Sequence, residues 1–385
     1  MPSHSKGWPV SEWNQFRGDE RNTGRIGRDL SGPQAKPAET WATELRGPVR
    51  CPPVVDHDTI YVGTTDGHLY ALDFQGRRRW VYETTASTTL APAVGGHRVV
   101  CCLADTVVAL DAPTGALEWE RPVEGLYTTP PTLDGGLLLV GNSDGLVALR
   151  AETGEAIWTA TLEGTAVSAP AVDEDQVYVA TQNEQVHALA LGSGESVWSA
   201  PTDGTVVGGP TLADERAYVA DTDGTLLALG VEDGRTWFTY EIRGGFTSAP
   251  TVLEGDDTLF VAADDDTLHV TDTTFGNRKL RGLLFSKAGL PLDGTPTTDP
   301  ILVGDVVIVG DETGGLYGVD ASDPDFRWHL PLESGVEGTP APVLTRGSRA
   351  TTADDGVTHA AVETGQLFVG TEDGRLRCLE WETPP

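Results

Sequence analysis

The sequence predicts an all-β fold, namely an eight-bladed β-propeller of four-stranded antiparallel blades. Three observations predict this fold: a repeat of about 40 residues, glycine-containing turns at fixed places in the repeat, and a tryptophan near the end of most copies. A period of this length is typical of propellers and solenoids. The 46 glycines and 25 prolines also suit a fold with many turns.

Each copy of the repeat predicts four short strands. A proline opens each copy, at Pro53, Pro92, Pro131, Pro170, Pro210, Pro250 and Pro300, with a degraded eighth copy near Pro340. Alternating apolar residues such as Ile60-Tyr61-Val62 follow and predict a strand with one buried face. Asp66-Gly67 then predicts a two-residue hairpin turn, in which the glycine supplies the positive φ. A third strand ending at Ala71-Leu72 and a tryptophan strand complete the blade.

The two ends of the chain predict how the ring closes. We expect a tryptophan to dock each blade on its neighbour, and these residues are Trp41, Trp80, Trp119, Trp158, Trp198, Trp237 and Trp328, with Phe285 in the remaining copy. The chain ends on the third strand of the last copy, Arg375 to Glu380, so the last blade lacks an outer strand that the segment around Trp41 supplies. We therefore expect residues 1–36 to form a lead-in and residues 37–385 to form one propeller, closed by pairing its two ends.

The charge balance excludes one class of partner and indicates a salty environment. The formal net charge is −32 at pH 7, the pI is about 4.4, and lysine is much rarer than arginine. Because such a surface repels phosphate backbones, we expect no nucleic-acid partner. The composition is typical of extreme halophiles, whose molar salt shortens the Debye length to about 3 Å. We predict that the fold loosens without salt; circular dichroism unchanged from molar salt to about 10 mM would contradict this.

The remaining composition indicates a soluble protein. The N-terminus has no apolar signal region, and no later run approaches the length of a membrane-spanning helix. We therefore expect a cytoplasmic monomer without membrane insertion, although a wrongly assigned start codon would hide an export signal. The four cysteines show no CxxC spacing and are too few for a disulfide scaffold.

Two inserts interrupt the repeat, and we expect both to lie on loops, where binding often resides. The first, between Phe275 and Pro300, carries a basic cluster of Arg278, Lys279, Arg281 and Lys287. This cluster either contacts a partner or belongs to a plain surface loop. The second, between Leu344 and Gln366, is polar, and we interpret it as a rim loop without a ligand.

The recurring segments resemble those of a known family. The segment Ala109 to Trp119 carries the pattern A-x-D-x-x-T-G-x-x-x-W, which resembles the tryptophan-docking motif of the PQQ-like (quinoprotein, BamB-like) propeller repeat. The segment Trp13 to Asp19, with Asn22-Thr23-Gly24, resembles the lead-in of many members. The resemblance covers residues 13 to 381 and implies that each tryptophan packs against the next blade. Burying an aromatic side chain of about 150–250 Å² at each junction gives a physical reason for its recurrence.

The resemblance implies two different functions. Some members are dehydrogenases that hold pyrroloquinoline quinone (PQQ) and Ca²⁺ on the propeller axis, and others, similar to the outer-membrane assembly factor BamB, are scaffolds without a cofactor. Cys101 and Cys102 bear on this choice, because quinoprotein alcohol dehydrogenases carry a vicinal cysteine disulfide beside the quinone. Here, however, Val99 to Cys102 aligns with the strand Ile60 to Gly63, and the Asp-Asn-Arg-Gly context expected after the pair is missing. We interpret both cysteines as packed strand residues. They would form a redox site beside the cofactor only if the protein binds PQQ.

Three further signals have plain structural interpretations. The match of Gly141 to Gly145 to the G-x-S-x-G nucleophile elbow lies on a predicted hairpin, whereas that motif needs a strand, a turn and a helix. Asp264-Asp265-Asp266 lies on a turn, without the carboxylate spacing of a calcium loop. His187 and His269 occupy the same position in two non-adjacent blades, so their spacing predicts no metal pair.

We therefore expect a non-catalytic propeller scaffold that presents its loops to a protein or peptide partner, with no catalytic residue, metal site or cofactor. A PQQ- and Ca²⁺-dependent alcohol or sugar dehydrogenase is the alternative. A third hypothesis is a sensor or carrier that binds a small ligand in the axial funnel. The repeat alone does not choose among them, because one fold hosts many functions.

Overall fold

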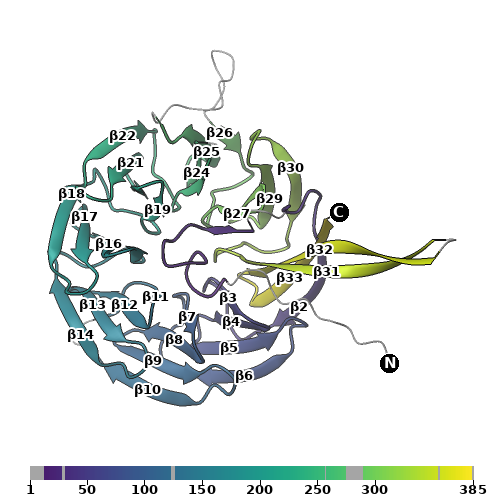
Figure 1. The fold of residues 1–385 in the computed structure, drawn as a ribbon, viewed down its shortest axis with the longest axis horizontal. Helices are drawn as coiled ribbons and strands as arrows, with labels where there is room; N and C mark the ends of the chain where they lie inside the picture. Colours follow the sequence, from purple (N-terminus) through teal and green to yellow (C-terminus); the bar gives the residue numbers. More distant parts are fainter. Residues whose placement is uncertain are drawn as a thin grey trace, which may run out of the picture.

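Eight antiparallel β-sheets stand around a central axis like blades (Figure 1). The computed structural model describes residues 13–27, 31–122, 126–255, 257–274, 289–353 and 356–383. Seven sheets have four strands, and the seventh along the chain gains a fifth, parallel strand from the N-terminal segment. The predicted all-β, eight-bladed propeller is confirmed. Within the same ranges, no helix is long and apolar enough to cross a membrane.

The strands of a blade follow one another along the chain, and each blade here is numbered from 1 to 8. Blades 1 to 4 contain β3 (Val54–Asp56), β4 (Thr59–Gly63), β5 (His68–Asp73), β6 (Arg78–Glu83); β7 (Ala93–Gly95), β8 (Arg98–Leu103), β9 (Thr106–Asp111), β10 (Leu117–Pro122); β11 (Thr132–Asp134), β12 (Leu137–Asn142), β13 (Gly145–Arg150), β14 (Ala156–Thr161); and β15 (Ala171–Asp173), β16 (Gln176–Thr181), β17 (Gln185–Ala190), β18 (Ser196–Pro201). Blades 5 to 8 contain β19 (Thr211–Ala213), β20 (Arg216–Ala220), β21 (Thr225–Gly230), β22 (Thr236–Glu241); β23 (Thr251–Leu253), β24 (Thr258–Ala263), β25 (Thr267–Asp272), β26 (Gly289–Pro291); β27 (Ile301–Val303), β28 (Val306–Gly310), β29 (Gly315–Asp320), β30 (Phe326–Pro331), with β1 (Arg25–Ile26); and β31 (Ala341–Ala353), β32 (Gly356–Gly370), β33 (Arg375–Thr383), with β2 (Ala38–Glu44).

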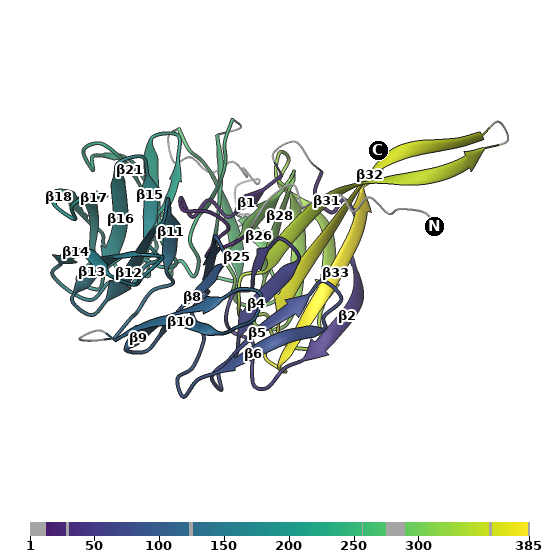
Figure 2. The same cartoon turned by 60° about the horizontal axis from the view of Figure 1, so that its bottom comes forward.

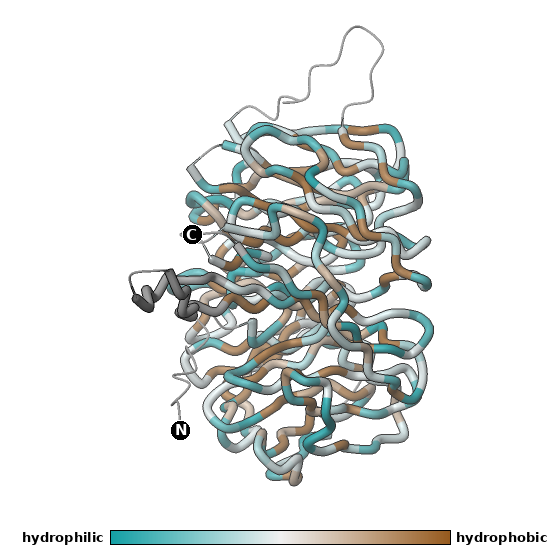
Figure 3. The backbone as a smooth tube through the Cα atoms, turned by 90° about the vertical axis from the view of Figure 1, so that its right-hand side faces the viewer, coloured by the Kyte–Doolittle hydropathy of each residue, from teal (hydrophilic) through white to brown (hydrophobic). Residues whose placement is uncertain are grey.

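The core is a series of apolar layers between blades. In β4, Ile60 and Val62 pack in one layer, while Tyr61 between them packs in the next. Successive side chains of a strand point to opposite faces, and here each face meets a neighbouring blade. This strand is therefore buried on both faces, although its alternation predicted one buried face. Figure 3 shows brown, hydrophobic segments spread through the body of the molecule.

The ring closes as the sequence predicts. β2, near the N-terminus, pairs antiparallel with β33, the last strand, and Trp41 lies opposite Cys378. The outer strand of blade 8 thus comes from the other end of the chain. We call the junction between this blade and blade 1 the seam.

One docking geometry recurs in successive blades and explains why the repeat ends in tryptophan. The indole Nε1 of Trp80 donates a hydrogen bond to the carbonyl of Ala112 in the next blade, over 2.8 Å. Its ring covers Gly115, which has a φ of +73° and no room for a side chain, since a Cβ would lie 2.6 Å from the ring. Equivalent indole hydrogen bonds run from Trp41 to Phe74 (2.9 Å), Trp119 to Ala151 (3.1 Å), Trp158 to Leu191 (2.8 Å), Trp198 to Val231 (2.8 Å) and Trp328 to Pro33 (2.7 Å).

Trp237 departs from this geometry, and the docking role expected for it is wrong. Its side chain is 63% exposed, while the next residue, Phe238, is buried and lies opposite Ala228. A bulge in the strand pairing at this point places two consecutive residues near one register position, and Phe238 takes the buried one. Trp237 lies instead over the guanidinium of Arg216, whose Cζ is 4.5 Å from the ring centroid, as in a cation–π contact.

The second insert is a strand extension, which corrects the expected rim loop. β31 and β32 stay paired from Ala341 and Phe368 out to Ala353 and Gly356, and the hairpin projects beyond the body of the ring (Figure 2). The basic cluster of the first insert, Arg278, Lys279, Arg281 and Lys287, and also Phe285, lie outside the described residues.

Candidate functional site

Residues 13–26, part of the expected lead-in, lie inside the ring near its axis (purple in Figure 1). They accept hydrogen bonds from the backbone N–H groups of the innermost strands. The donor and acceptor pairs are Val55 to Trp13 (2.6 Å), Val94 to Asn14 (2.7 Å), Leu133 to the Gln15 side chain (2.7 Å), Val172 to Glu20 (2.7 Å), Leu212 to Arg21 (3.0 Å) and Leu302 to Gly24 (2.7 Å). Because a buried N–H without a partner is costly, this segment satisfies groups that would otherwise face the axis unpaired.

Arg17 extends these contacts to blade 6. Its side chain is 1% exposed and donates to the carbonyls of Asn22 (3.0 Å) and Pro250 (2.6 Å) and to the hydroxyl of Thr251 (2.6 Å). Asp299 lies 3.6 Å away and forms a buried ion pair with it. Burial lowers the pKa of Arg17, and this carboxylate opposes the shift. The segment therefore contacts the inner strands of blades 1 to 7.

The axial residues do not fit PQQ and Ca²⁺, which the resemblance implies for the enzymes of the family. The donors of Arg17 are directed to protein acceptors, and Asp299 accepts the backbone N–H of Ala249 over 2.7 Å and the hydroxyl of Thr339 over 3.1 Å. Within the described ranges, no three His, Cys, Asp or Glu side chains are grouped so that they could hold a metal ion. These axial residues act as structural links between blades.

Cys101 and Cys102 lie on β8, and both thiols are free and buried. Their side chains lie in different layers: Cys101 packs with Tyr61 and Trp80 toward blade 1, and Cys102 with Tyr127 toward blade 3. Burial raises the pKa of both thiols, so they stay protonated at neutral pH. A protonated, buried thiol is a poor nucleophile, which supports the packing interpretation.

The three other sequence signals lie apart from one another. Ser143 sits in the hairpin between β12 and β13, where its backbone N–H binds the carbonyl of Leu126. Asp264 and Asp266 accept hydrogen bonds from Gly245 (2.9 Å) and Thr295 (2.9 Å) in adjoining loops. Each of these residues thus stabilises a turn.

The two histidines occupy separate gaps between blades. His269 is buried with its Nδ1 3.0 Å from the hydroxyl of Tyr240 and its Nε2 3.2 Å from Asp265. His187 has its Nε2 3.2 Å from the hydroxyl of Thr181. Burial lowers the pKa of His187, and Glu163 opposes the shift. The structure therefore does not bring the two histidines together.

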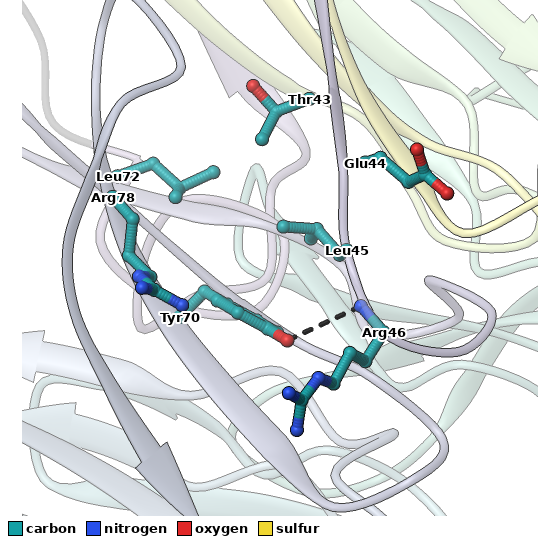
Figure 4. Close-up of a pocket in the computed structure, with 7 residues that line it drawn as sticks. All are labelled: Thr43, Glu44, Leu45, Arg46, Tyr70, Leu72 and Arg78. Atoms are coloured by element: carbon teal, nitrogen blue, oxygen red, sulfur yellow. Dashed lines mark hydrogen bonds between the residues drawn. The ribbon is translucent and has the colours of Figure 1, made fainter.

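Two grooves occupy equivalent places between blades. The seam groove, between blades 8 and 1, encloses about 520 Å³ and is lined by Thr43, Glu44, Leu45, Arg46, Tyr70, Leu72 and Arg78 (Figure 4). The internal groove, between blades 3 and 4, encloses about 370 Å³ and is lined by Thr161, Leu162, Glu163, Asn183, Gln185, His187, Ser196 and Ser199.

The outer rim carries exposed apolar side chains. They lie on the outermost strands β10, β14, β18, β22 and β30, and are Leu117, Ile157, Val197, Trp237 and Phe326. The first four strands belong to consecutive blades and follow one another around the ring (Figure 1). Ile157, Val197 and Trp237 each stand directly before the buried aromatic of their strand. We call these three the rim stripe.

Sequence reasoning missed the axial path of residues 13–26 and the charge of the seam groove. The lead-in has no repeat period that would place it, although its Trp13 and Phe16 signalled burial. A comparison of charge at each repeat position would have singled out Arg46 and Arg78. The position of Arg46 holds Glu163 in the internal groove, and the position of Arg78 holds Ser196.

Known proteins share this fold at low sequence identity. Solved structures similar to this one include BamB from Moraxella catarrhalis, with 19% identity, a TM-score of 0.69, and coverage of 90% of this chain and 100% of that one. They also include a europium-containing methanol dehydrogenase (14%, TM-score 0.73, 94% and 90% covered) and a quinohemoprotein alcohol dehydrogenase from Comamonas testosteroni (15%, TM-score 0.73, 97% and 81% covered). No curated protein matches the chain. The sequence profile described as outer membrane protein assembly factor BamB matches residues 34–126, 103–206 and 182–384. The chain therefore belongs to this family of PQQ-like, BamB-like β-propellers.

Proposed function

We propose that the chain is a non-catalytic scaffold that binds a partner protein through the rim of its propeller. The observation that carries this proposal is the rim stripe, Ile157, Val197 and Trp237, whose side chains are 46%, 47% and 63% exposed. The three side chains lie on the outermost strands of three consecutive blades, and tryptophan is enriched in the centres of interfaces. The cation–π contact with Arg216 also holds Trp237 in place before a partner arrives.

The axis gives the proposal further support. In a propeller, the central channel offers a natural place for a small ligand, and in this chain residues 13–26 lie there, with Trp13, Phe16 and Arg17 buried. This arrangement favours an outer surface as the binding site.

The experiment compares recovery of a partner by two variants. The rim variant Ile157→Thr, Val197→Thr, Trp237→Gln removes the apolar stripe, and the control Arg79→Thr changes the corresponding position of blade 1. Affinity purification from an extract of the native cells in molar KCl, followed by mass spectrometry, measures the partner. We expect a stoichiometric partner with the unchanged protein and the control, and its loss with the rim variant. Recovery of no partner above background contradicts the scaffold function.

The alternative is a PQQ- and Ca²⁺-dependent dehydrogenase, which the described axial residues do not fit but which two similar solved structures, described as alcohol-oxidising enzymes, make worth a direct test. Titration with PQQ and Ca²⁺ in molar KCl, followed by quenching of tryptophan fluorescence, tests it. A Cys101→Ser, Cys102→Ser variant provides the comparison. Saturable binding that this variant weakens would favour the enzyme and overturn the scaffold proposal.

A further inference from the structure

The seam groove holds two arginines without a carboxylate partner, in a protein whose net charge is −32. Other arginines, such as Arg50, Arg79 and Arg98, form salt bridges with nearby acidic residues. Within the described ranges, neither Arg46 nor Arg78 forms a salt bridge or a side-chain hydrogen bond. Both side chains lie beside Tyr70, and Glu44 on the same wall points away from them (Figure 4). The groove is therefore a local positive site on an acidic molecule.

The fold does not require these two arginines. Counted from the docked tryptophan, the internal groove has Glu163 in the place of Arg46 and Ser196 in the place of Arg78. The groove between blades 6 and 7 has Asp293 in the place of Arg46, with the same backbone hydrogen bond to a tyrosine hydroxyl. The same backbone thus accepts acidic residues at this position, so packing of the blades does not explain the positive charge.

Tyr70 adds a third donor to the groove. Its hydroxyl accepts the backbone N–H of Arg46 over 3.3 Å, as drawn in Figure 4. The equivalent Tyr317 accepts the N–H of Asp293 over 2.9 Å and donates its own proton to Asp311 over 2.8 Å. In blade 1 the place of Asp311 is taken by Thr64, which donates to Asp66 over 2.7 Å. Within the described ranges, the proton of Tyr70 therefore has no carboxylate acceptor.

We propose that the seam groove binds a carboxylate group of a protein partner, held by the guanidinium groups of Arg46 and Arg78 and by the hydroxyl of Tyr70. Arginine and carboxylate match in geometry and form charge-assisted hydrogen bonds. A phosphate dianion suffers more repulsion from the net charge of this protein than a single carboxylate does, which favours a Glu or Asp side chain. This inference rests on the proposed scaffold function in one respect: the carboxylate belongs to a partner protein. The rim stripe is a separate surface.

The first measurement is saturation-transfer NMR, which detects weak binding of small peptides. The probe is an acetylated, amidated Ala-Ala-Glu-Ala-Ala peptide, and the comparators replace its Glu by Gln or by phosphoserine. We expect saturable binding of the Glu peptide, weakened roughly tenfold or more in the Gln peptide, because the loss removes charge-assisted hydrogen bonds. Tighter binding of the phosphoserine peptide would overturn the assignment to carboxylates.

Exchanging residues between the two grooves provides the matched variants. Arg46→Glu, Arg78→Ser gives the seam groove the residues of the internal groove, and we expect affinity for the Glu peptide to fall roughly tenfold or more. Adding Glu163→Arg, His187→Tyr and Ser196→Arg to that variant should restore binding in the internal groove, because it then carries all three proposed donors. Circular dichroism checks that each variant stays folded. Unchanged affinity in the Arg46→Glu, Arg78→Ser variant would overturn the proposal.

Failure of the carboxylate site and failure of the scaffold function would give different experimental results. If the seam variant binds the Glu peptide normally while the rim variant loses its partner, the carboxylate site is wrong and the scaffold function stands. If the Glu peptide binds as expected while the unchanged protein recovers no partner, the groove stands as a carboxylate site and the scaffold function fails.

Discussion

The seam groove and the internal groove share one backbone design and differ in chemistry. Each lies between two blades that a tryptophan joins, Trp41 in one case and Trp158 in the other. The seam groove has two arginines and a tyrosine hydroxyl, whereas the internal groove has Glu163 and His187 at the corresponding places. Repetition thus fixes the shape of each groove, while the side chains at a few repeat positions set its charge.

The largest effect on stability should come from removing the tryptophan that joins the two blades at each groove. Trp158 is 9% exposed, and Trp158→Ala should lower the free energy of unfolding by about 3–5 kcal/mol, because it removes a buried aromatic and its hydrogen bond. Trp41 is partly exposed, so Trp41→Ala should cost less, about 2–3 kcal/mol. Urea unfolding followed by circular dichroism measures both. A greater loss at Trp41 would show that the seam, where β2 and β33 pair, depends more on its tryptophan than the internal junction does.

The next effect concerns the glycines beneath these two rings. Gly76 and Gly194 have φ values of +74° and +72°, and a Cβ would lie 2.7 Å from Trp41 and 2.5 Å from Trp158. Gly76→Ala and Gly194→Ala should each cost about 1–3 kcal/mol through overpacking and backbone strain. Gly96→Ala is the control, since its φ is +65° and a Cβ there would meet no atom within 4 Å. Equal losses in all three variants would show that the tryptophan contact contributes nothing.

A smaller effect should distinguish the two grooves by the way in which the stability of their variants depends on pH. Burial lowers the pKa of His187 from 6.5, so the neutral form is favoured in the folded state. Above pH 6.5, the pKa of His187 in the unfolded chain, this residue contributes fully to stability. As pH falls from 6.5 through the lower pKa of the folded state, the free energy of unfolding decreases by up to about 1.4 kcal/mol per pH unit. His187→Gln should therefore flatten the fall in urea midpoint between pH 7.5 and 5.5. Tyr70→Phe, the matched change in the seam groove, should leave that slope as it is.

The smallest effect should be that of the arginine pair on folding. Arg46 and Arg78 are exposed and unpaired within the described ranges, so Arg46→Glu, Arg78→Ser should change the free energy of unfolding by no more than about 0.5 kcal/mol. Urea unfolding in molar KCl measures this value. A loss of several kcal/mol would mean that the arginines hold the seam together, and the contrast between the grooves would then be structural.

The repeat made most of the fold predictable, because each copy carries its own turn glycine and aromatic residue. Eight copies and the position of Trp41 were enough to predict the closed ring. The error at Trp237 arose because a tryptophan was expected where a phenylalanine stands: the spacing G-x-x-x-W, counted from Gly234, places Phe238 and not Trp237 at the docking position. The axial path of residues 13–26 could not be predicted, since its contacts follow no period. The halophilic character stays a prediction.

The path of the N-terminal segment has a consequence for the order of folding. Arg17 hydrogen-bonds to Pro250, which lies 233 residues further along the chain, and β2 pairs with the very last strand. Arg17 and β2 therefore reach these partners only after the blades between them in the sequence have been made. Contacts of such long range slow folding, and until they form each blade keeps open edges that can join other chains. Closure of this ring is therefore a late step in folding, and the chain is exposed to aggregation until it is complete.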